Sequence, residues 1–271
     1  MTTKNWLSDL RRQIRMDAPL ILCLTSPVYL RDCANAISAL GGKPVLAEHP
    51  GEVGEITASA GALYLSLGSL TEGRMEAMQI AVAAAKQAGV PWLLDLMEAE
   101  HSQLRLSFAR RLMEGMAPAL VKGTAEELRA LAGLPAPAPQ GETGERSTLE
   151  ADADTARQAA VALRTVVLLS GKVDLISDGS RTVAVRNGSH LLSYVPGSGC
   201  VQGALAAAFL SKEEPFPSAV AGAAVLGLAS EFSAKGFQKH GSITQFADGI
   251  VDGVFALDDD TLESGLKLGS L

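Results

Sequence analysis

LILCLTSPVYLRDCANAISALGGKPVLA, residues 20–47, is the stretch that decides the fold. It opens with a continuous apolar run at 20–24, which is typical of a strand buried on both faces. Ser26 and Pro27 then have the residue types of a helix start, and the helix they predict runs to Leu40, before two glycines. A second apolar run at 44–47 predicts the next strand. Strand, helix and strand in this order indicate a βαβ unit with a right-handed crossover.

The rest of the chain repeats this alternation of strand and helix. Short apolar runs predict further strands at 62–66, 92–95, 119–122 and 166–169. Amphipathic or alanine-rich segments predict helices at 5–15, 52–60, 71–88, 103–115, 124–131, 155–163, 198–210, 217–234 and 243–257. The pattern predicts an α/β fold in which helices cover a mainly parallel sheet.

Two Asx-Gly pairs indicate that the sheet changes direction at one edge. Asp178-Gly179 and Asn187-Gly188 separate three apolar runs, at 173–177, 182–186 and 191–194. Such pairs between apolar runs are strong hairpin signals. We therefore expect antiparallel strands along one edge of the sheet.

The chain is expected to form a single domain over residues 1–271, because it shows neither an internal repeat nor a second core. Residues 134–154 interrupt the alternation of strand and helix with prolines, glycines and acidic side chains. We interpret this segment as an exposed, mobile loop within the domain.

Composition and charge exclude several classes of protein. Hydrophobic residues make up 47% of the chain and charged residues 20%, which excludes a disordered protein. The net charge of −7 argues against a nucleic-acid partner. The uncharged apolar run at 204–210 is too short to span a bilayer, and the N-terminal segment has no apolar signal region. No membrane partner is therefore expected. An odd number of cysteines, three, favours free thiols and a cytoplasmic protein.

The turn Pro196-Gly197-Ser198-Gly199-Cys200, between an apolar run and a helix, is the sharpest local motif. Its glycines let the backbone approach an anion, and the first amides of the helix then point at that anion. Cys200 would lie in the first turn, where the helix dipole favours a thiolate. The alternative is a tight turn with a buried cysteine. The motif matches neither the P-loop nor the dinucleotide fingerprint.

Three further strand ends carry polar side chains. Asp95 could hold magnesium on a nucleotide, or it could cap the next helix. Lys122 could reach a phosphate and Glu126 a magnesium-bound water, whereas the alternative for this stretch is a capping box between Thr124 and Glu127. Ser170 could contact a phosphate or simply begin a turn. The carboxyl ends of parallel strands meet at one edge, so the fold would bring these features together.

These motifs occur in an order and at a spacing that resemble the hydroxyethylthiazole kinase family, from about residue 20 to residue 257. The matching segments are Ala34-Asn35-Ala36, residues 40–47, Glu52-Val53, residues 67–70, Gly89-Val90-Pro91 leading to Asp95, residues 122–128, Asp178-Gly179, Asn187-Gly188 and residues 197–200. A co-linear series of this length is more specific than any one of its motifs.

The resemblance implies a ribokinase-like, three-layer α/β/α kinase that phosphorylates the hydroxyethyl group of 4-methyl-5-(2-hydroxyethyl)thiazole, with ATP and Mg²⁺, in thiamine salvage. It also implies a homotrimer with active sites between neighbouring subunits. The roles it implies are a catalytic base for Cys200, ATP contacts for Lys122, Thr124, Ser170 and Gly199, thiazole contacts for Leu46 and Gly197, and magnesium-side positions for Asp95 and Glu126.

The sequence also departs from the family pattern. Lys122 stands in place of an arginine, Thr124 in place of an asparagine, and Leu46 in place of a methionine. Residues 96–101 replace a glycine-rich continuation and include two glutamates. These departures leave two alternatives: a ligand-binding member that has lost phosphoryl transfer, and a kinase of another small alcohol. A dehydratase of hydrated nicotinamide cofactors shares the fold, but that group has aspartate at the position of Cys200.

Overall fold

The computed structural model describes residues 5–135 and 148–271, without the side chains of residues 238–240. In this part of the chain one nine-stranded sheet has the order β2-β1-β3-β4-β5-β6-β7-β8-β9. The strands are β1 (Leu20–Leu24), β2 (Lys43–Val45), β3 (Ala62–Ser66), β4 (Trp92–Asp95), β5 (Leu120–Gly123), β6 (Val166–Leu169), β7 (Asp174–Ser177), β8 (Thr182–Val185) and β9 (Leu268–Ser270). Strands β1 to β6 are parallel, and β7, β8 and β9 extend the sheet as antiparallel strands. The predicted mainly parallel sheet with an antiparallel edge is thus confirmed.

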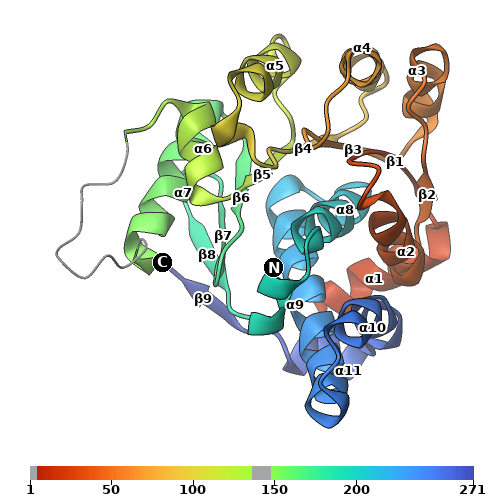
Figure 1. The fold of residues 1–271 in the computed structure, drawn as a ribbon, viewed down its shortest axis with the longest axis vertical. Helices are drawn as coiled ribbons and strands as arrows, with labels where there is room; N and C mark the ends of the chain where they lie inside the picture. The colour runs from red at the N-terminus through yellow and green to blue at the C-terminus, as the bar shows by residue number, and fades with distance from the viewer. Residues whose placement is uncertain (1–4, 136–147) are drawn as a thin grey trace.

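Helices cover both faces of the sheet (Figure 1). One layer holds α3 (Pro50–Ser59), α4 (Glu72–Ala88), α5 (Gln103–Met113), α6 (Ala125–Ala132) and α7 (Leu149–Leu163), with the short 3₁₀ helix η1 (Ala99–His101). The other holds α1 (Trp6–Asp17), α2 (Leu30–Leu40), α8 (Ser198–Leu210), α9 (Pro215–His240), α10 (Ile243–Ala256) and α11 (Asp259–Ser264), with the 3₁₀ helix η2 (His190–Tyr194).

The two hydrophobic cores follow from the two faces of the strands. In β1, Ile21 and Cys23 belong to the core beneath α8, whereas Leu22 and Leu24 belong to the opposite core. Successive side chains of a strand point to opposite faces, so a strand that is apolar throughout must be covered on both sides. The apolar run at 20–24 therefore required the three layers that the structure shows.

Helices α8 and α9 form the centre of one layer. α8 is apolar all round, and its residues 200–210 are buried between the sheet and α9. Within the described residues, one helical segment, Pro215–Phe237 of α9, has the length and the mean hydropathy (1.2) of a membrane span. Of its most apolar window, 83% is buried inside the protein, as in a core helix.

One predicted strand was wrong, and one observed strand was not predicted. Residues 191–194, predicted as a strand, lie in η2, and the outermost antiparallel strand is β9 from the far end of the chain. Asn187 explains the difference, because its side-chain amide donates to the carbonyl of Gly265 and its Oδ1 accepts from the amide of Lys267. These bonds direct residues 268–270 onto β8, where a local hairpin strand was expected.

Some boundaries also differ from the prediction. α2 begins at Leu30 rather than at Ser26, whose hydroxyl pairs with that of Ser69 and caps no helix. α7 begins at Leu149, so residues 149–154 are helical and do not form the predicted loop. The rest of that predicted loop, residues 136–147, lies outside the described residues.

Candidate active site

The glycine turn before α8 lies in close contact with its neighbours, and at Gly197 this contact excludes a side chain. Gly197 is the N-cap of α8 with a φ of +87°, and a Cβ there would lie 2.2 Å from the ring of Tyr29. A Cβ on Gly199 would lie 3.3 Å from the Nζ of Lys122. The first amides of a helix lack acceptors within the helix, so this turn presents N–H groups close to a lysine ammonium. Both features suit an anion.

Cys200 lies in the first turn of α8, as predicted, but it is not a thiolate. Its side chain is buried, with 3% of the residue exposed. Burial raises the pKa of the thiol to about 11, and the negative charge of Asp95 acts in the same direction. The expectation that the helix dipole would lower this pKa was wrong, because desolvation of a thiolate outweighs the dipole at this depth.

Asp95 and Lys122 form an ion pair at the carboxyl ends of β4 and β5. The Nζ of Lys122 lies 3.3 Å from one carboxylate oxygen of Asp95, and both side chains are 5% exposed or less. The hydroxyl of Tyr64, on β3, donates to the other oxygen at 2.9 Å. Burial lowers the pKa of Lys122, but Asp95 and the neighbouring Cys200 and Glu127 outweigh it, and the pKa is raised. Asp95 is therefore an acceptor within a buried network, not a helix cap.

Of the two neighbouring glutamates in α6, Glu127 faces this network and Glu126 is exposed. Glu127 accepts from the amide of Thr124 at 2.7 Å, and its own amide donates to the hydroxyl of Thr124, which completes the capping box considered from the sequence. Burial raises the pKa of Glu127, although Lys122 opposes the shift. Successive helix residues are about 100° apart, so only one of the pair can face inwards. Glu126, the residue that the sequence analysis placed on the magnesium side, is the exposed residue of the two.

Ser170 follows β6, and its neighbourhood contains a pair of side chains that the sequence did not point to. The amide of Ser170 donates to the carbonyl of Gly123 at 2.9 Å, which places it beside the end of β5. Asp174 accepts from the amide of Gly171 at 3.1 Å and from the side chain of Gln202, on α8, at 2.6 Å. Burial raises the pKa of Asp174 to about 6. This pair ties the loop after β6 to the helix that carries Cys200.

The ends of β1 and β3 are held by Arg74, a buried residue of α4. Its guanidinium donates to the carbonyls of Thr25, Gly68 and Ser69. Leu46, the predicted thiazole contact, follows β2 at the edge of the sheet and is 47% exposed. The strand ends thus form one continuous rim from Leu46 to Ser170.

The glutamates of residues 96–101 contact side chains outside the ion pair. The side chain of Glu98 is 67% exposed and lies 3.2 Å from Arg105, while Glu100 is paired with His101 at 3.5 Å. The charge of Glu98 therefore does not crowd the glycine turn. The same segment carries Met97, whose sulfur lies 3.6 Å from that of Cys200.

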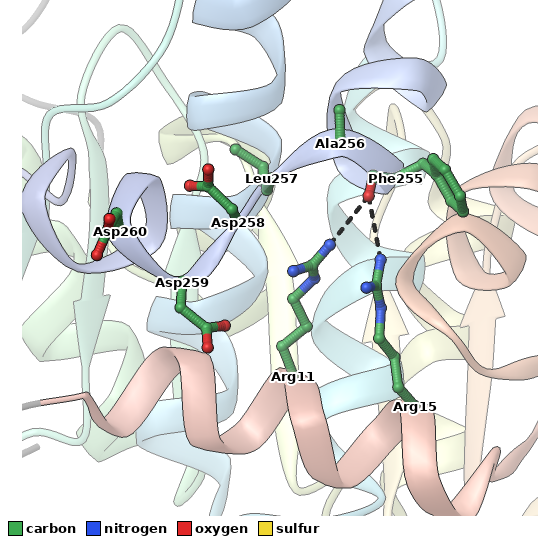
Figure 2. A pocket seen from close by; sticks show the side chains of 8 residues that line it. All are labelled: Arg11, Arg15, Phe255, Ala256, Leu257, Asp258, Asp259 and Asp260. Atoms are coloured by element: carbon green, nitrogen blue, oxygen red, sulfur yellow. Dashed lines mark hydrogen bonds between the residues drawn. The ribbon is translucent and has the colours of Figure 1, made fainter.

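A hollow of about 530 Å³ lies away from the strand ends, between α1 and the junction of α10 and α11 (Figure 2). Two of its residues, Arg11 and Arg15, both donate to the carbonyl of Phe255, near the end of α10. No residue that lines it follows a strand of the parallel sheet. We interpret this hollow as a by-product of how arginines cap a helix, and not as part of the active site.

Comparison with known proteins identifies the family. The model of the hydroxyethylthiazole kinase family matches residues 11–260. A hydroxyethylthiazole kinase of Chloroflexus aurantiacus is 36% identical, over 99% of this chain and 98% of its own length. The chain belongs to the hydroxyethylthiazole kinase family. Hydroxyethylthiazole kinase 2 of Clostridium botulinum is 32% identical, over 97% of this chain and 99% of its own length.

Solved structures agree with this assignment. The hydroxyethylthiazole kinase of Pyrococcus horikoshii superposes with a TM-score of 0.87 at 28% identity, covering 98% of this chain and 99% of its own. A pyridoxal kinase of Staphylococcus aureus, at 14% identity, shares the fold with a TM-score of 0.61, covering 78% of this chain and 86% of its own. The fold is therefore ribokinase-like, and the chain is a small-molecule kinase, as the sequence predicted.

Proposed function

We propose that this kinase transfers the γ-phosphoryl group of ATP to the hydroxyl of 4-methyl-5-(2-hydroxyethyl)thiazole, in thiamine salvage. The observation that carries the proposal is the turn at residues 197–200, whose amides lie beside Lys122 with Cys200 in the first turn of the helix. A turn of this kind suits a phosphoryl group in transfer. Family membership supports the choice of acceptor.

In the proposed reaction the hydroxyl oxygen of the acceptor forms a bond to the γ-phosphorus, and the bond from that phosphorus to the bridging oxygen of ADP breaks. Lys122 and the amides of Gly199 and Cys200 stabilise the charge on the transferred group. The transition state of phosphoryl transfer is loose, so the hydroxyl keeps its proton until the new bond to phosphorus is largely formed, and the proton then passes to an oxygen of the transferred phosphoryl group and on to water. Cys200, protonated at neutral pH, therefore orients the acceptor hydroxyl by hydrogen bonding and is not a strong base.

Magnesium fits this site only as part of a nucleotide complex. Both oxygens of Asp95 already accept hydrogen bonds, and each oxygen of Glu127 accepts a backbone amide. Among the described residues no group of three or more ligating side chains is arranged for a metal. Magnesium bound through ATP phosphates needs only one or two protein carboxylates, often through water. We assign the role of these carboxylates to Glu127 and Asp95. When bound, it neutralises charge on the phosphates.

We further propose a homotrimer in the cytoplasm. Val28 and Leu46, on loops at the rim of the sheet, are 73% and 47% exposed, and a neighbouring copy would cover such apolar side chains. The three cysteines are free and buried, as expected of a protein in a reducing compartment. Light scattering should give three times the 28.1 kDa mass of the chain. A monomer at micromolar concentration would contradict the trimer.

The test is release of ADP in a coupled assay with the thiazole alcohol, ATP and magnesium. We expect turnover that requires the alcohol and is abolished by a chelator. Folded protein that shows no turnover above the background without alcohol would disprove the kinase proposal. Cys200→Ala should lower kcat about tenfold, less than the roughly 10²–10⁴-fold contributed by a general base. Tight binding of the alcohol without any turnover would instead favour a ligand-binding member of the family.

A further inference from the structure

The thioether of Met97 occupies the space directly beside the thiol of Cys200. Its sulfur lies 3.6 Å from the sulfur of Cys200 and 3.4 Å from the hydroxyl of Ser66, at the end of β3. A Cβ on Gly68 would lie 2.3 Å from the same sulfur, so the backbone of the next loop is also in contact with it. Cys200 and Ser66 both donate to this sulfur, a weak acceptor.

The position of Met97 is imposed by its surroundings. Met97 and Glu98 have φ values of +29° and +57°, in the left-handed region that residues other than glycine rarely adopt. The carbonyl of Met97 accepts from Arg105 at 2.8 Å, and the amide of Glu98 donates to Glu127. A strained backbone persists only where neighbouring groups hold it, and such segments cluster at ligand-binding sites. Glu127 and Arg105 thus hold Met97 over the thiol.

Met97 fills the space between Cys200 and the ends of two strands. This space is bounded by the ends of β3 and β4 and by Cys200, and it lies on the sheet side that leads to Leu46. Gly199, in the glycine turn, lies beside Lys122 at the end of β5, and Ser170 lies on the far side of β5 from Met97. An alcohol that presents its hydroxyl to Cys200 from this side therefore passes the thioether of Met97.

We propose that Met97 determines acceptor specificity in this kinase, by narrowing the approach to Cys200 so that only a hydroxyl on a short, slender arm reaches the thiol. The thioether is apolar and polarizable, and it makes favourable contacts with aromatic rings, so an aromatic heterocycle with a short hydroxyalkyl arm is the class of acceptor it selects. Shortening Met97 opens the approach, and Leu at this position keeps it closed because leucine and methionine have similar volumes.

The first experiment measures access to Cys200 and needs no kinase activity. Each variant is treated with iodoacetamide, and labelling of the peptide that contains Cys200 is followed by mass spectrometry. Met97→Ala should speed this labelling by about tenfold, because reactivity follows access to the thiol. Met97→Leu should stay close to the parent rate, and Met113→Ala, a half-buried methionine on α5, serves as the matched control. Equal rates in folded Met97→Ala and in the parent would overturn the proposal.

The second experiment rests on the proposed function. It compares kcat/KM for the hydroxyethyl thiazole with that for its hydroxypropyl homologue. Met97→Ala should raise the relative preference for the longer arm by about tenfold, mainly through KM, because one methylene in a pocket discriminates by 10–200-fold. Met97→Leu should not. Faster labelling without any change in acceptor preference would overturn the specificity role. No turnover with any alcohol, with labelling as expected, would overturn the proposed kinase reaction and leave the access role standing.

Discussion

Lys122 and Arg11 are two buried cations of this chain, and they behave in opposite ways. Lys122 lies against the carboxylate of Asp95, and its pKa is raised despite burial. Arg11 lies at the end of α10, where its guanidinium donates to the carbonyl of Phe255 (Figure 2). Burial, with Arg15 acting in the same direction, lowers the pKa of Arg11 to about 10, and Asp258 and Asp259 only partly oppose this.

The difference shows what compensates a buried charge. A carboxylate in contact offsets the loss of hydration, whereas a helix-terminal carbonyl carries only a partial charge. The first arrangement holds two charges in the kinase site; the second only caps a helix. Removing a partner from each arrangement should therefore have unequal effects.

Lys122→Met should have the largest effect, because it leaves the Asp95 carboxylate buried without a cation. We expect the free energy of unfolding to fall by about 3–5 kcal/mol, the usual cost of removing one partner of a buried ion pair. Urea denaturation at pH 7 measures it. The double variant Lys122→Met with Asp95→Asn should recover much of the loss. A loss below about 1 kcal/mol in the single variant would mean that water replaces the lysine.

Tyr64→Phe should have the next largest effect. It removes the hydroxyl that donates to Asp95 at 2.9 Å, at a residue with no exposed surface. We expect a loss of about 1.5–3 kcal/mol in unfolding free energy, the range for a hydrogen bond to a charged group. Phe108→Leu, in the opposite core, controls for packing alone. Unchanged stability would show that Lys122 alone satisfies the carboxylate.

Asp174→Asn tests a buried carboxylate that has only neutral donors. Its pKa is raised to about 6, so the charged form above that pH is disfavoured in the folded protein. The folded protein binds the proton of this carboxyl more tightly than the unfolded chain does. The resulting contribution to stability is fully present below the unfolded pKa near 3.8 and is lost as the pH rises through 6. The variant should therefore be more stable than the parent by about 1–2 kcal/mol at pH 7 and show no advantage at pH 4. Thermal unfolding at both pH values measures this, and an advantage at pH 4 alone would contradict it.

Arg11→Met should have the smallest effect. It removes the hydrogen bond from Arg11 to the carbonyl of Phe255, to which Arg15 still donates, and it also removes a desolvated charge. The two changes oppose each other, so we expect a difference within about 1 kcal/mol. Urea denaturation alongside Lys122→Met compares the two buried cations directly. A loss as large as that of Lys122→Met would mean that burial alone, and not the partner, sets the cost.

The parallel part of the fold was predictable because its signals are local. Apolar runs such as residues 62–66 and 92–95 coincide with the strands β3 and β4, since a strand covered on both faces must be apolar throughout. The antiparallel edge was less predictable. Asn187-Gly188 gives a hairpin signal, but the side chain of Asn187 bonds to residues about 80 positions away, and no local pattern reveals that.

For the site, the sequence located the strand ends but not the direction of each side chain. Glu126 and Glu127 are neighbours, and only their depth in the fold separates them. No sequence motif marked Tyr64 or Gln202, because their partners Asp95 and Asp174 come from other elements. The charge state of Cys200 depends on burial by groups distant in sequence, so a rule based on helix position alone gave the wrong direction.

The docking of α1 has a consequence for how the chain folds during synthesis. Its buried residues Leu7, Leu10 and Ile14 belong to the core to which α2, α8 and α11 contribute, and Arg11 bonds to a carbonyl 244 residues later. At usual elongation rates, about 12–50 seconds separate the synthesis of these two segments. Throughout that time α1 lacks its contacts with α11. Contacts this distant in sequence slow folding and give chaperones a defined segment to protect.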